Sequence, residues 1–461
     1  MRQFVHLHVH SQYSLLDGQA SISKLVDKAI ADGMPGIALT DHGSMFGVKE
    51  FFNYVKKKNS ARKDKIKSLQ GLIERLENGT ASEAEMGDDA SAALAKARLE
   101  LDSIPKADFK GIIGSEVYVA RRRLFNKEKG TGDQSGYHLI LLAKNQTGYK
   151  NLIKIVSKGY TEGFYGRPRT DRVELEKYHE GLICCSACIG GEVPRLIREE
   201  RYEEAAAAIE WHRSIFGDDY YLELQLHKAT VERANHEAYE VQLKVNEFLV
   251  DYAHKHGVKL VCTNDVHFVN EEDAEAHDRL ICLGTGKDLD DPKRMLYSKQ
   301  EWMKTTAEMN AIFDYVPESL DNTVEVCNKV ESYSIDHAPI MPTFAIPEEF
   351  GTEEGYRQKY SERDIFDEFT RDENGNVVLS EDEANKKIEK LGGYDKLYRI
   401  KLEADYLAKL AMDGAHKRYG EELDEETLTR LKFELHIMKT MGFPWLLPYR
   451  AGLHTCCSRR T

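Results

Sequence analysis

Short apolar runs alternate with amphipathic stretches through the first 270 residues of the chain. The runs occupy residues 4–10, 36–42, 109–120, 137–144, 181–188, 220–227 and 258–267. Between them, residues 22–32, 149–159, 203–216 and 231–256 carry apolar side chains at helical spacing. Regular alternation of strand and helix predicts parallel strands covered by helices, and seven such runs predict a closed or nearly closed α/β barrel. Functional side chains gather at the carboxyl ends of the strands in barrels of this kind.

Two parts of the chain depart from this pattern. Residues 56–110 are dense in Lys, Glu and Ala, which predicts an exposed helical hairpin inserted between the second and third strands. After residue 284 the chain becomes charged, with an extended run at 338–342, a turn at 372–376 and long helices after it. We therefore expect a metal-binding barrel over residues 1–284 and a second region over residues 285–444.

Side chains that bind metals recur beside the apolar runs. His8 and His10 share one face of the first run with His6, since side chains alternate along a strand. A pair of histidines two residues apart can bind one cation, although such a pair by itself is more often structural. Seven further candidates follow: Asp17, His42, Glu116, His138, Cys188, Asp265 and His267. A structural role explains each of these residues, taken singly, at least as well as metal binding does. Together, however, they predict a metal site with several ions.

Glu116 stands out among the candidates because it lies inside an apolar run rather than beyond one. An unpaired buried carboxylate is costly, so a cation or a hydrogen-bond network must compensate it. His138 is the exception in another way, because it begins its run instead of ending it.

Composition narrows the function classes. The 461 residues carry a net charge of −14, so the chain is not a globally basic nucleic-acid binder. Arginines at 121, 122, 123, 167 and 169 follow strand ends or lie in loops, where they could grip DNA phosphates, and His227 ends a run at the predicted rim. No apolar run approaches membrane length, and the eight cysteines form no spaced disulfide framework, which favours a reduced cytoplasmic setting.

Several phrases resemble the polymerase and histidinol phosphatase (PHP) domain, in the form that begins the bacterial replicative DNA polymerase III alpha subunits. They lie at residues 4–11, 13–18, 39–43, 114–119, 163–169 and 263–268, and the resemblance extends from residue 1 to residue 444. It implies a distorted seven-stranded β/α barrel, similar to a TIM barrel. A connector and the first part of a mostly helical polymerase palm region would follow the barrel.

The resemblance also implies three divalent metal ions, with zinc, manganese and iron all compatible with the ligands. One ion would be held by His8, His10, Glu116 and Asp265, a second by His138 and Cys188 with Glu116 bridging, and a third by Asp17, His42 and His267. Asp265, His267 and Glu116 would then take part in catalysis, and Arg121, Arg167, Arg169 and His227 would contact the substrate.

The implied activity is phosphodiester hydrolysis by a 3′–5′ exonuclease that removes mispaired primer ends from DNA, in company with other replicase subunits. Two alternatives remain open. The barrel would be a metal-stabilised scaffold that docks a separate proofreading exonuclease, or a small-molecule phosphatase of the histidinol phosphatase type. The polymerase-like phrases argue against the latter.

The last part of the chain lacks expected features. No Pro-Asp-x-Asp motif occurs, so polymerase activity is not expected from this chain alone. The resemblance stops at Pro444. If the nucleotides that follow were read one position later, they would encode the sequence with which the family continues. We therefore predict that residues 445–461 are a frameshifted, non-native tail. Sequencing the gene tests this, because an intact frame and a genuine stop after Thr461 would contradict it.

Overall fold

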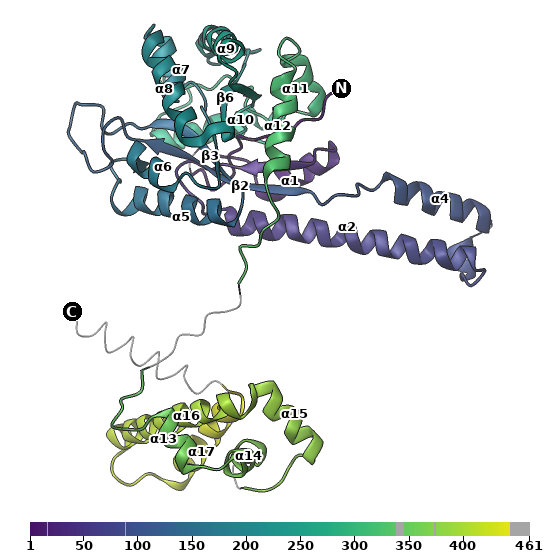
Figure 1. Ribbon diagram of the computed structural model, residues 1–461, viewed down its shortest axis with the longest axis vertical. Helices are drawn as coiled ribbons and strands as arrows, with labels where there is room; N and C mark the ends of the chain where they lie inside the picture. The colour runs from purple at the N-terminus through teal and green to yellow at the C-terminus, as the bar shows by residue number, and fades with distance from the viewer. Residues whose placement is uncertain (16, 88, 338–344, 373–374, 443–461) are drawn as a thin grey trace. The chain divides into compact units, whose positions relative to one another are not determined.

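The computed structural model describes residues 1–442, except for residues 16, 88, 338–344 and 373–374. The extended run expected at 338–342, two positions of the turn expected at 372–376, and the tail at 445–461 lie outside the described residues. The chain divides into two compact units, Met1–Asp336 and His337–Thr461 (Figure 1).

A curled, mixed sheet forms the centre of the first unit. Its strands are β1 (Gly36–Leu39), β2 (Lys110–Val119), β3 (Tyr137–Ala143), β5 (Leu182–Cys185), β6 (Tyr220–Leu224) and β7 (Lys259–Cys262), in that spatial order. The short β4 (Arg169–Thr170) pairs with β2 off this path. The expected α/β class is confirmed, because helices connect most of these strands and cover the sheet.

The expectation of uniformly parallel strands was wrong for β3. β3 runs antiparallel to both β2 and β5, whereas β1–β2, β5–β6 and β6–β7 are parallel. Residues 121–136, which join β2 to β3, form no helix. A parallel pair needs a long crossover, usually a helix, so a chain that returns through a loop pairs antiparallel.

Residues 4–10 join the two ends of the sheet without forming a regular strand. The Val9 amide donates to the Thr40 hydroxyl at 2.8 Å rather than to a neighbouring strand, so the ladder is interrupted there. On one side the Thr40 amide donates to the Val9 carbonyl, at 2.8 Å. On the other side the His10 amide donates to the Val266 carbonyl, at 2.7 Å. This segment therefore lies between β1 and the chain that follows β7.

Helices surround the sheet in the order of the chain. The first unit contains α1 (Ile22–Ala31), α2 (Val48–Glu77), α3 (Glu83–Met86), α4 (Ala90–Ser103), α5 (Gln146–Thr161), α6 (Arg172–Tyr178), α7 (Glu192–Arg198), α8 (Tyr202–Phe216), α9 (Glu237–His256), α10 (Ala274–Thr285), α11 (Thr306–Ile312) and α12 (Glu318–Lys329), with 3₁₀ turns at Gly217–Asp219 and Glu271–Asp273. The helix expected from residue 231 begins at Glu237, because the Asn235 side chain caps the backbone of Ala238.

Apolar side chains of the sheet divide into two buried clusters. The larger one packs against α1, α5, α8 and α9, with Leu25, Leu152 and Leu249 among its members. The smaller one contains Leu7 and Ile140 and packs against α12. The sheet is thus covered on both faces.

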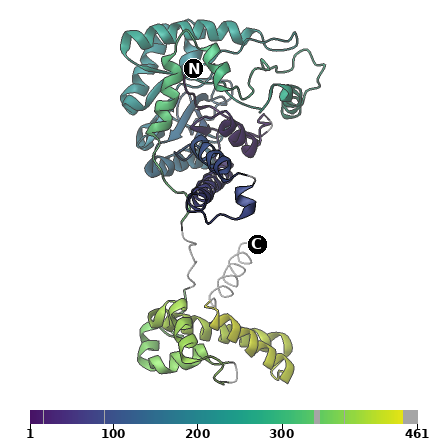
Figure 2. The same ribbon diagram turned by 90° about the vertical axis from the view of Figure 1, so that its right-hand side faces the viewer.

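The insertion between β1 and β2 is helical. α2 and α4 lie side by side and extend away from the barrel, and Figure 2 views this pair nearly along its length. The second unit contains α13 (Glu353–Lys359), α14 (Glu362–Thr370), α15 (Glu381–Leu391), α16 (Gly393–Tyr419) and α17 (Glu425–Thr440). Phe369, Leu397 and Ile365 are among its buried residues. Among the described residues, no helix combines the length and apolar character that crossing a bilayer would need.

Candidate metal centre

All nine predicted ligands lie at one end of the barrel. The shared position follows from the topology, because parallel strands direct their carboxyl ends to the same edge of a sheet. His42, Cys188, Asp265 and His267 follow β1, β5 and β7 directly. His138 begins its strand instead, and the antiparallel direction of β3 brings that beginning to the same edge. The reversal of β3 thus accounts for the one ligand that broke the sequence pattern.

The ligand atoms form three groups within which all atoms lie within 4.8 Å of one another. The groups are His8, His10 and Asp265; Glu116, His138 and Cys188; and His10, His42 and His267. Asp17 adjoins the third group, with its Oδ2 3.1 Å from His42 Nε2. These groups differ from the three implied ligand sets in detail: Glu116 is absent from the first, Asp17 is absent from the third, and His10 belongs to two of them.

Glu116 occupies the centre of the site and is fully buried. Its Oε1 lies 2.8 Å from His138 Nδ1, and its Oε2 lies 2.5 Å from His42 Nδ1. Burial alone would raise the pKa of this carboxyl, but the imidazoles of His138, His42 and His8 hold it well below its ordinary value. A carboxylate that presents each oxygen to a different imidazole is suited to bridging two cations.

Several buried ligand atoms have no hydrogen-bond partner in the described structure. They are Asp17 Oδ1, His42 Nδ1, Glu116 Oε2, Asp265 Oδ1 and His267 Nε2. Glu116 Oε2 still lies beside His42 Nδ1, and Asp265 Oδ1 beside His8 and His10, but without the geometry of a hydrogen bond. A buried polar atom left without a hydrogen bond costs up to about 1–3 kcal/mol, so this cluster favours an additional partner such as a cation. Divalent cations bind imidazole nitrogen, carboxylate oxygen and thiolate sulfur at this kind of site. The residues present therefore fit bound metal ions.

His8 is oriented by a carboxylate that sequence reasoning missed. Its Nδ1 lies 2.7 Å from Oε1 of Glu223, which is buried in β6. Burial lowers the pKa of His8, but Asp265, Glu223 and Glu116 raise it well above its ordinary value. Carboxylates commonly hold the outer nitrogen of a metal-binding histidine in this way. The signal was present in the sequence, because Glu223 interrupts an apolar run just as Glu116 does.

His10 is oriented by a relay of hydrogen bonds on its other side. The Ser14 hydroxyl donates to Asp41 Oδ1 at 2.9 Å, and so it accepts a hydrogen bond from His10 Nδ1 at 3.0 Å. Burial, with His42 and His267, lowers the pKa of His10 to about 3. The neutral ring thus carries its proton on Nδ1 and presents an Nε2 lone pair to the centre.

Asp265 is held in a left-handed backbone conformation, with a φ of 45°. Residues other than glycine seldom adopt it, and such strain persists where surrounding contacts impose it. The neighbouring Asn264 side chain supplies two of these contacts, by donating to the carbonyls of Gln300 at 2.9 Å and Trp302 at 2.7 Å. The Asp265 carboxylate oxygen Oδ1 lies 3.1 Å from Nε2 of His8 and 3.2 Å from Nε2 of His10.

Cys188 completes the second group of ligand atoms. Its sulfur lies 3.5 Å from His138 Nδ1 and 3.8 Å from Glu116 Oε1. Burial, together with the charges of Glu116 and Asp265, raises the pKa of the thiol well above its ordinary value. A cation is therefore required to hold this cysteine as a thiolate.

The predicted substrate contacts are placed differently from one another. Arg121 is exposed, with its guanidinium 5.3 Å from the Tyr137 ring. Arg167 lies over the Tyr118 ring at 4.7 Å and lines a cavity that contains His42. His227 is buried and lines a second cavity beside the centre, of about 230 Å³. Arg167 and His227 thus line cavities that contain candidate metal ligands, whereas Arg121 lines neither of these two cavities.

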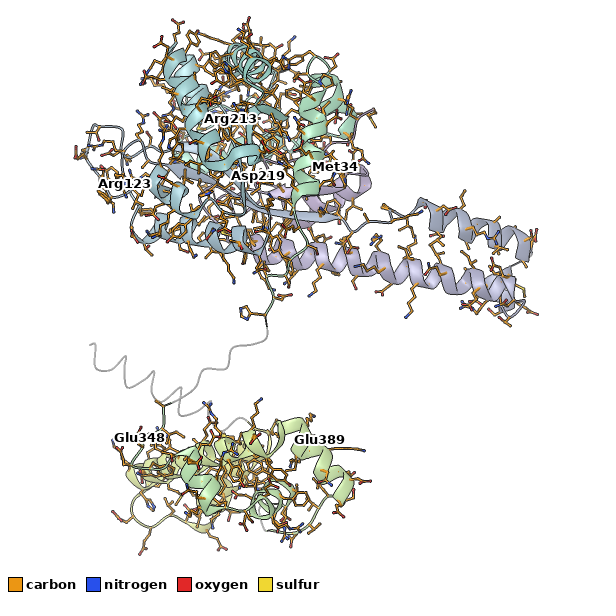
Figure 3. The ribbon with its side chains drawn as sticks, in the orientation of Figure 1. Met34, Arg123, Arg213, Asp219, Glu348 and Glu389 are labelled. Carbon is orange, nitrogen blue, oxygen red and sulfur yellow. The ribbon has the colours of Figure 1, made fainter. Side chains whose placement is uncertain are left out.

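Arg169 does not fit the expected phosphate contact. It is fully buried, and its guanidinium donates to the backbone carbonyls of Gly163, Leu124, Asn126 and Asp133. Its charge is thus used to hold loop 121–136 against the segment before β4. Arg122 and Arg123 in that loop pair with Asp133 and Asp171, and Figure 3 labels Arg123 there.

Comparison with known proteins places the chain in a family. Residues 6–227 match the PHP domain model. Curated proteins named DNA polymerase III subunit alpha match over most of the chain: 42% identical over 352 residues in Borreliella burgdorferi, 35% over 368 in Treponema pallidum and 35% over 356 in Thermus aquaticus. These alignments cover 76%, 79% and 75% of this chain, and 26%, 26% and 24% of the relatives.

The chain therefore contains a PHP domain and is homologous to DNA polymerase III alpha subunits over most of its length. It spans about a quarter of the length of these curated relatives. A solved structure of a candidate metal-dependent phosphoesterase from Bifidobacterium adolescentis is 11% identical, with a TM-score of 0.21 over 67% of this chain and 96% of its own. That score is too low to support an argument about function.

Proposed function

We propose that this chain is part of a replicative DNA polymerase III alpha subunit. Its PHP centre would bind three divalent metal ions and hydrolyse phosphodiester bonds as a 3′–5′ exonuclease that removes mispaired primer ends. The observation that carries this proposal is the set of buried ligand atoms without hydrogen-bond partners, which converge at one end of the barrel. Homology to a replicative polymerase supplies DNA as the substrate class.

The candidate ligands would divide among three ions. His8, His10, Glu116 and Asp265 would hold the first, and His138 and Cys188, with Glu116, would hold the second; two of the three groups of ligand atoms support this division. Asp17, His42 and His267 would hold the third, and the short distance between Asp17 and His42 supports it. Zinc, manganese and iron each accept this mixture of nitrogen, oxygen and sulfur ligands. Bound divalent ions supply Lewis acidity to the attacking water and to the phosphoryl oxygens.

The protein's own residues set the charge and geometry of the centre. Glu116 and Asp265 stay ionised, because surrounding imidazoles hold the pKa of each carboxyl below its ordinary value against the effect of burial. Glu223 and Ser14 fix the rings of His8 and His10 from outside. Arg167 at the cavity edge would bind a phosphate of the incoming strand.

Other replicase subunits, including a proofreading exonuclease subunit, are proposed as partners in the cytoplasm. Polymerase activity itself is assigned to parts of the alpha subunit beyond this chain. The alternative of a metal-stabilised scaffold differs from the exonuclease only in catalysis, so metal content and hydrolysis must be measured together.

The test compares the purified chain with the Asp265→Asn variant, and Asp251→Asn serves as a control at an exposed position on α9. Metal content is measured by elemental analysis, and hydrolysis is measured on single-stranded and mismatched-primer DNA. We expect hydrolysis by the wild type and the control, and a loss of about 100-fold or more in Asp265→Asn. Full metal occupancy without hydrolysis would support the scaffold. Cleavage of phosphomonoesters alone would support the small-molecule phosphatase.

A further inference from the structure

A cavity of about 440 Å³ opens directly onto the metal centre. Asp17 and His42 line its inner side, and Phe46, Tyr160 and Arg167 line its outer side. Because one cavity contains both ligands and exposed aromatic rings, a molecule bound to these rings extends to the metals. The rings belong to the turn after β1 and to α5, so unrelated parts of the sequence meet here.

Three aromatic side chains form a row that begins in this cavity: Phe46 and Tyr160 line it, and Phe164 adjoins Tyr160 beyond the lining. Phe46, Tyr160 and Phe164 keep 56%, 39% and 49% of their surface exposed. The ring centres of Phe46 and Tyr160 lie 5.8 Å apart, and those of Tyr160 and Phe164 lie 6.3 Å apart with an angle of 23° between the planes. A contiguous group of exposed aromatic rings marks a surface that binds something apolar and flat.

A cationic side chain stands beside this row. The Arg167 guanidinium lies over the Tyr118 ring and donates to the Tyr118 hydroxyl. Tyr118 in turn contacts the ligand His138 edge-on, with ring centres 5.2 Å apart. The charge of Arg167 is therefore fixed between the aromatic row and the metal ligands. Aromatic faces beside a positive charge are the recognition elements of single-stranded nucleic acid, whose bases stack while its phosphates pair with cations.

From this geometry we infer that Phe46, Tyr160 and Phe164 are a stacking platform for the unpaired bases at the end of a DNA strand. The inference rests on the proposed function, and it adds the reason why the proposed exonuclease would prefer unpaired strand ends. Bases inside a duplex have both faces covered by their neighbours and a paired terminal base exposes only one, so the platform takes unpaired or frayed nucleotides in preference to paired ones. Arg167 holds a backbone phosphate, and the strand end then reaches the centre. The platform thus selects mispaired ends before any chemistry occurs.

The test measures DNA binding separately from hydrolysis. A fluorescein-labelled single-stranded oligonucleotide, with phosphorothioate linkages at its 3′ end to prevent shortening, is titrated with the full chain and followed by anisotropy. Phe46→Ala and Phe164→Ala are each expected to weaken binding by about 5- to 100-fold, the fold-change equivalent to one stacked base. Phe164→Tyr should bind as the wild type does. A blunt duplex of the same sequence should bind more weakly than the single strand.

Phe125→Ala is the matched control, because Phe125 is 61% exposed but neither lines this cavity nor contacts its rings as Phe164 does; Arg123 covers the Phe125 ring instead. Equal binding by the wild type and both platform variants would overturn the inference, as would equal losses in Phe125→Ala or equal affinity for duplex. If the chain hydrolyses no DNA while the platform variants still lose binding, the proposed catalysis fails and the platform stands. If the chain hydrolyses DNA while these variants bind normally, the stacking platform fails and the proposed catalysis stands.

Discussion

Replacing Glu223 with glutamine tests whether the centre depends on a residue that touches no metal. The Glu223 carboxylate accepts hydrogen bonds from Thr263 Oγ1 at 2.6 Å, Gln225 Nε2 at 3.1 Å and the Ala187 amide at 3.2 Å. It also lies 2.7 Å from His8 Nδ1. Glutamine keeps the shape of the side chain, but it removes the charge and turns one acceptor oxygen into a donor amide.

Two costs follow from this change. The amide of Glu223→Gln must face a donor, either the Ala187 amide or the group around His8, and one lost buried hydrogen bond costs about 1–3 kcal/mol of unfolding free energy. The His8 ring also loses its orienting charge. Changes at such outer partners typically weaken metal binding by about 10- to 100-fold, which is about 1.4–2.7 kcal/mol.

The assay is a competition titration of the purified chain against a chelator of known affinity, with zinc and then manganese. Glu247→Gln, an exposed substitution of the same kind on α9, provides the control. We expect the weakest site of Glu223→Gln to shift by at least tenfold and the control to match the wild type. Unchanged metal affinity in a folded Glu223→Gln variant would refute the orienting role of this carboxylate.

Three further predictions concern stability. Arg169→Ala should lower the free energy of unfolding by about 3 kcal/mol or more, since it leaves several buried carbonyls without donors; urea denaturation measures this. Gly148→Ala should cost about 2 kcal/mol or more in the same assay, because the new Cβ would lie 1.7 Å from the Gly181 carbonyl oxygen. Burial lowers the pKa of His212 from 6.5 to about 4, so the unfolded state binds more protons between these values. Stability should therefore fall by about 2 kcal/mol from pH 7 to pH 5 through this residue, and His212→Gln should lose that part of the pH dependence.

The first two of these predictions have a control variant, and each of the three has an outcome that contradicts it. Arg198→Ala, at an exposed position on α7, should leave the free energy of unfolding unchanged. If it lost as much as Arg169→Ala, the buried hydrogen bonds of Arg169 would not explain the loss. Gly71→Ala in α2 meets only a flexible Arg75 side chain at 3.4 Å and should be neutral or slightly stabilising. A Gly148→Ala protein as stable as the wild type would contradict the second prediction, because the backbone at Gly181 would then move away from the new Cβ at little cost. An identical pH profile for wild type and His212→Gln would contradict the third prediction.

The sequence predicts that the candidate ligands lie at one end of the barrel because the apolar pattern and the topology share a cause. A buried parallel strand reads as an apolar run, and the residue after it lies at the shared carboxyl edge. His42 and Asp265 follow this rule. Strand direction, in contrast, leaves no mark in an apolar run, since period and composition are the same in both directions. The reversal of β3, and with it the position of His138, therefore required the structure.

Arg169 and Glu223 show a second limit of the sequence. Five arginines in similar loops looked equally available for phosphate, and only tertiary contacts distinguish the buried Arg169 from the exposed Arg121. Glu223 carried the same local signal as Glu116, but its partner His8 lies far away in the chain. Such pairings depend on which strands become neighbours, which local propensity does not encode.

The segment at residues 4–10 links the assembly of the centre to the order in which the chain is made. It supplies His8 and His10, and it completes its pairing through Val266, which is synthesised more than 250 residues later. Its pairing with Thr40 can form early, but its other edge must wait until the chain around Asp265 has emerged. Contacts so distant in sequence form late and slowly. The arrival of residues 258–267 then has two effects at once: it pairs that free edge, and it brings the Asp265 carboxylate to His8 and His10.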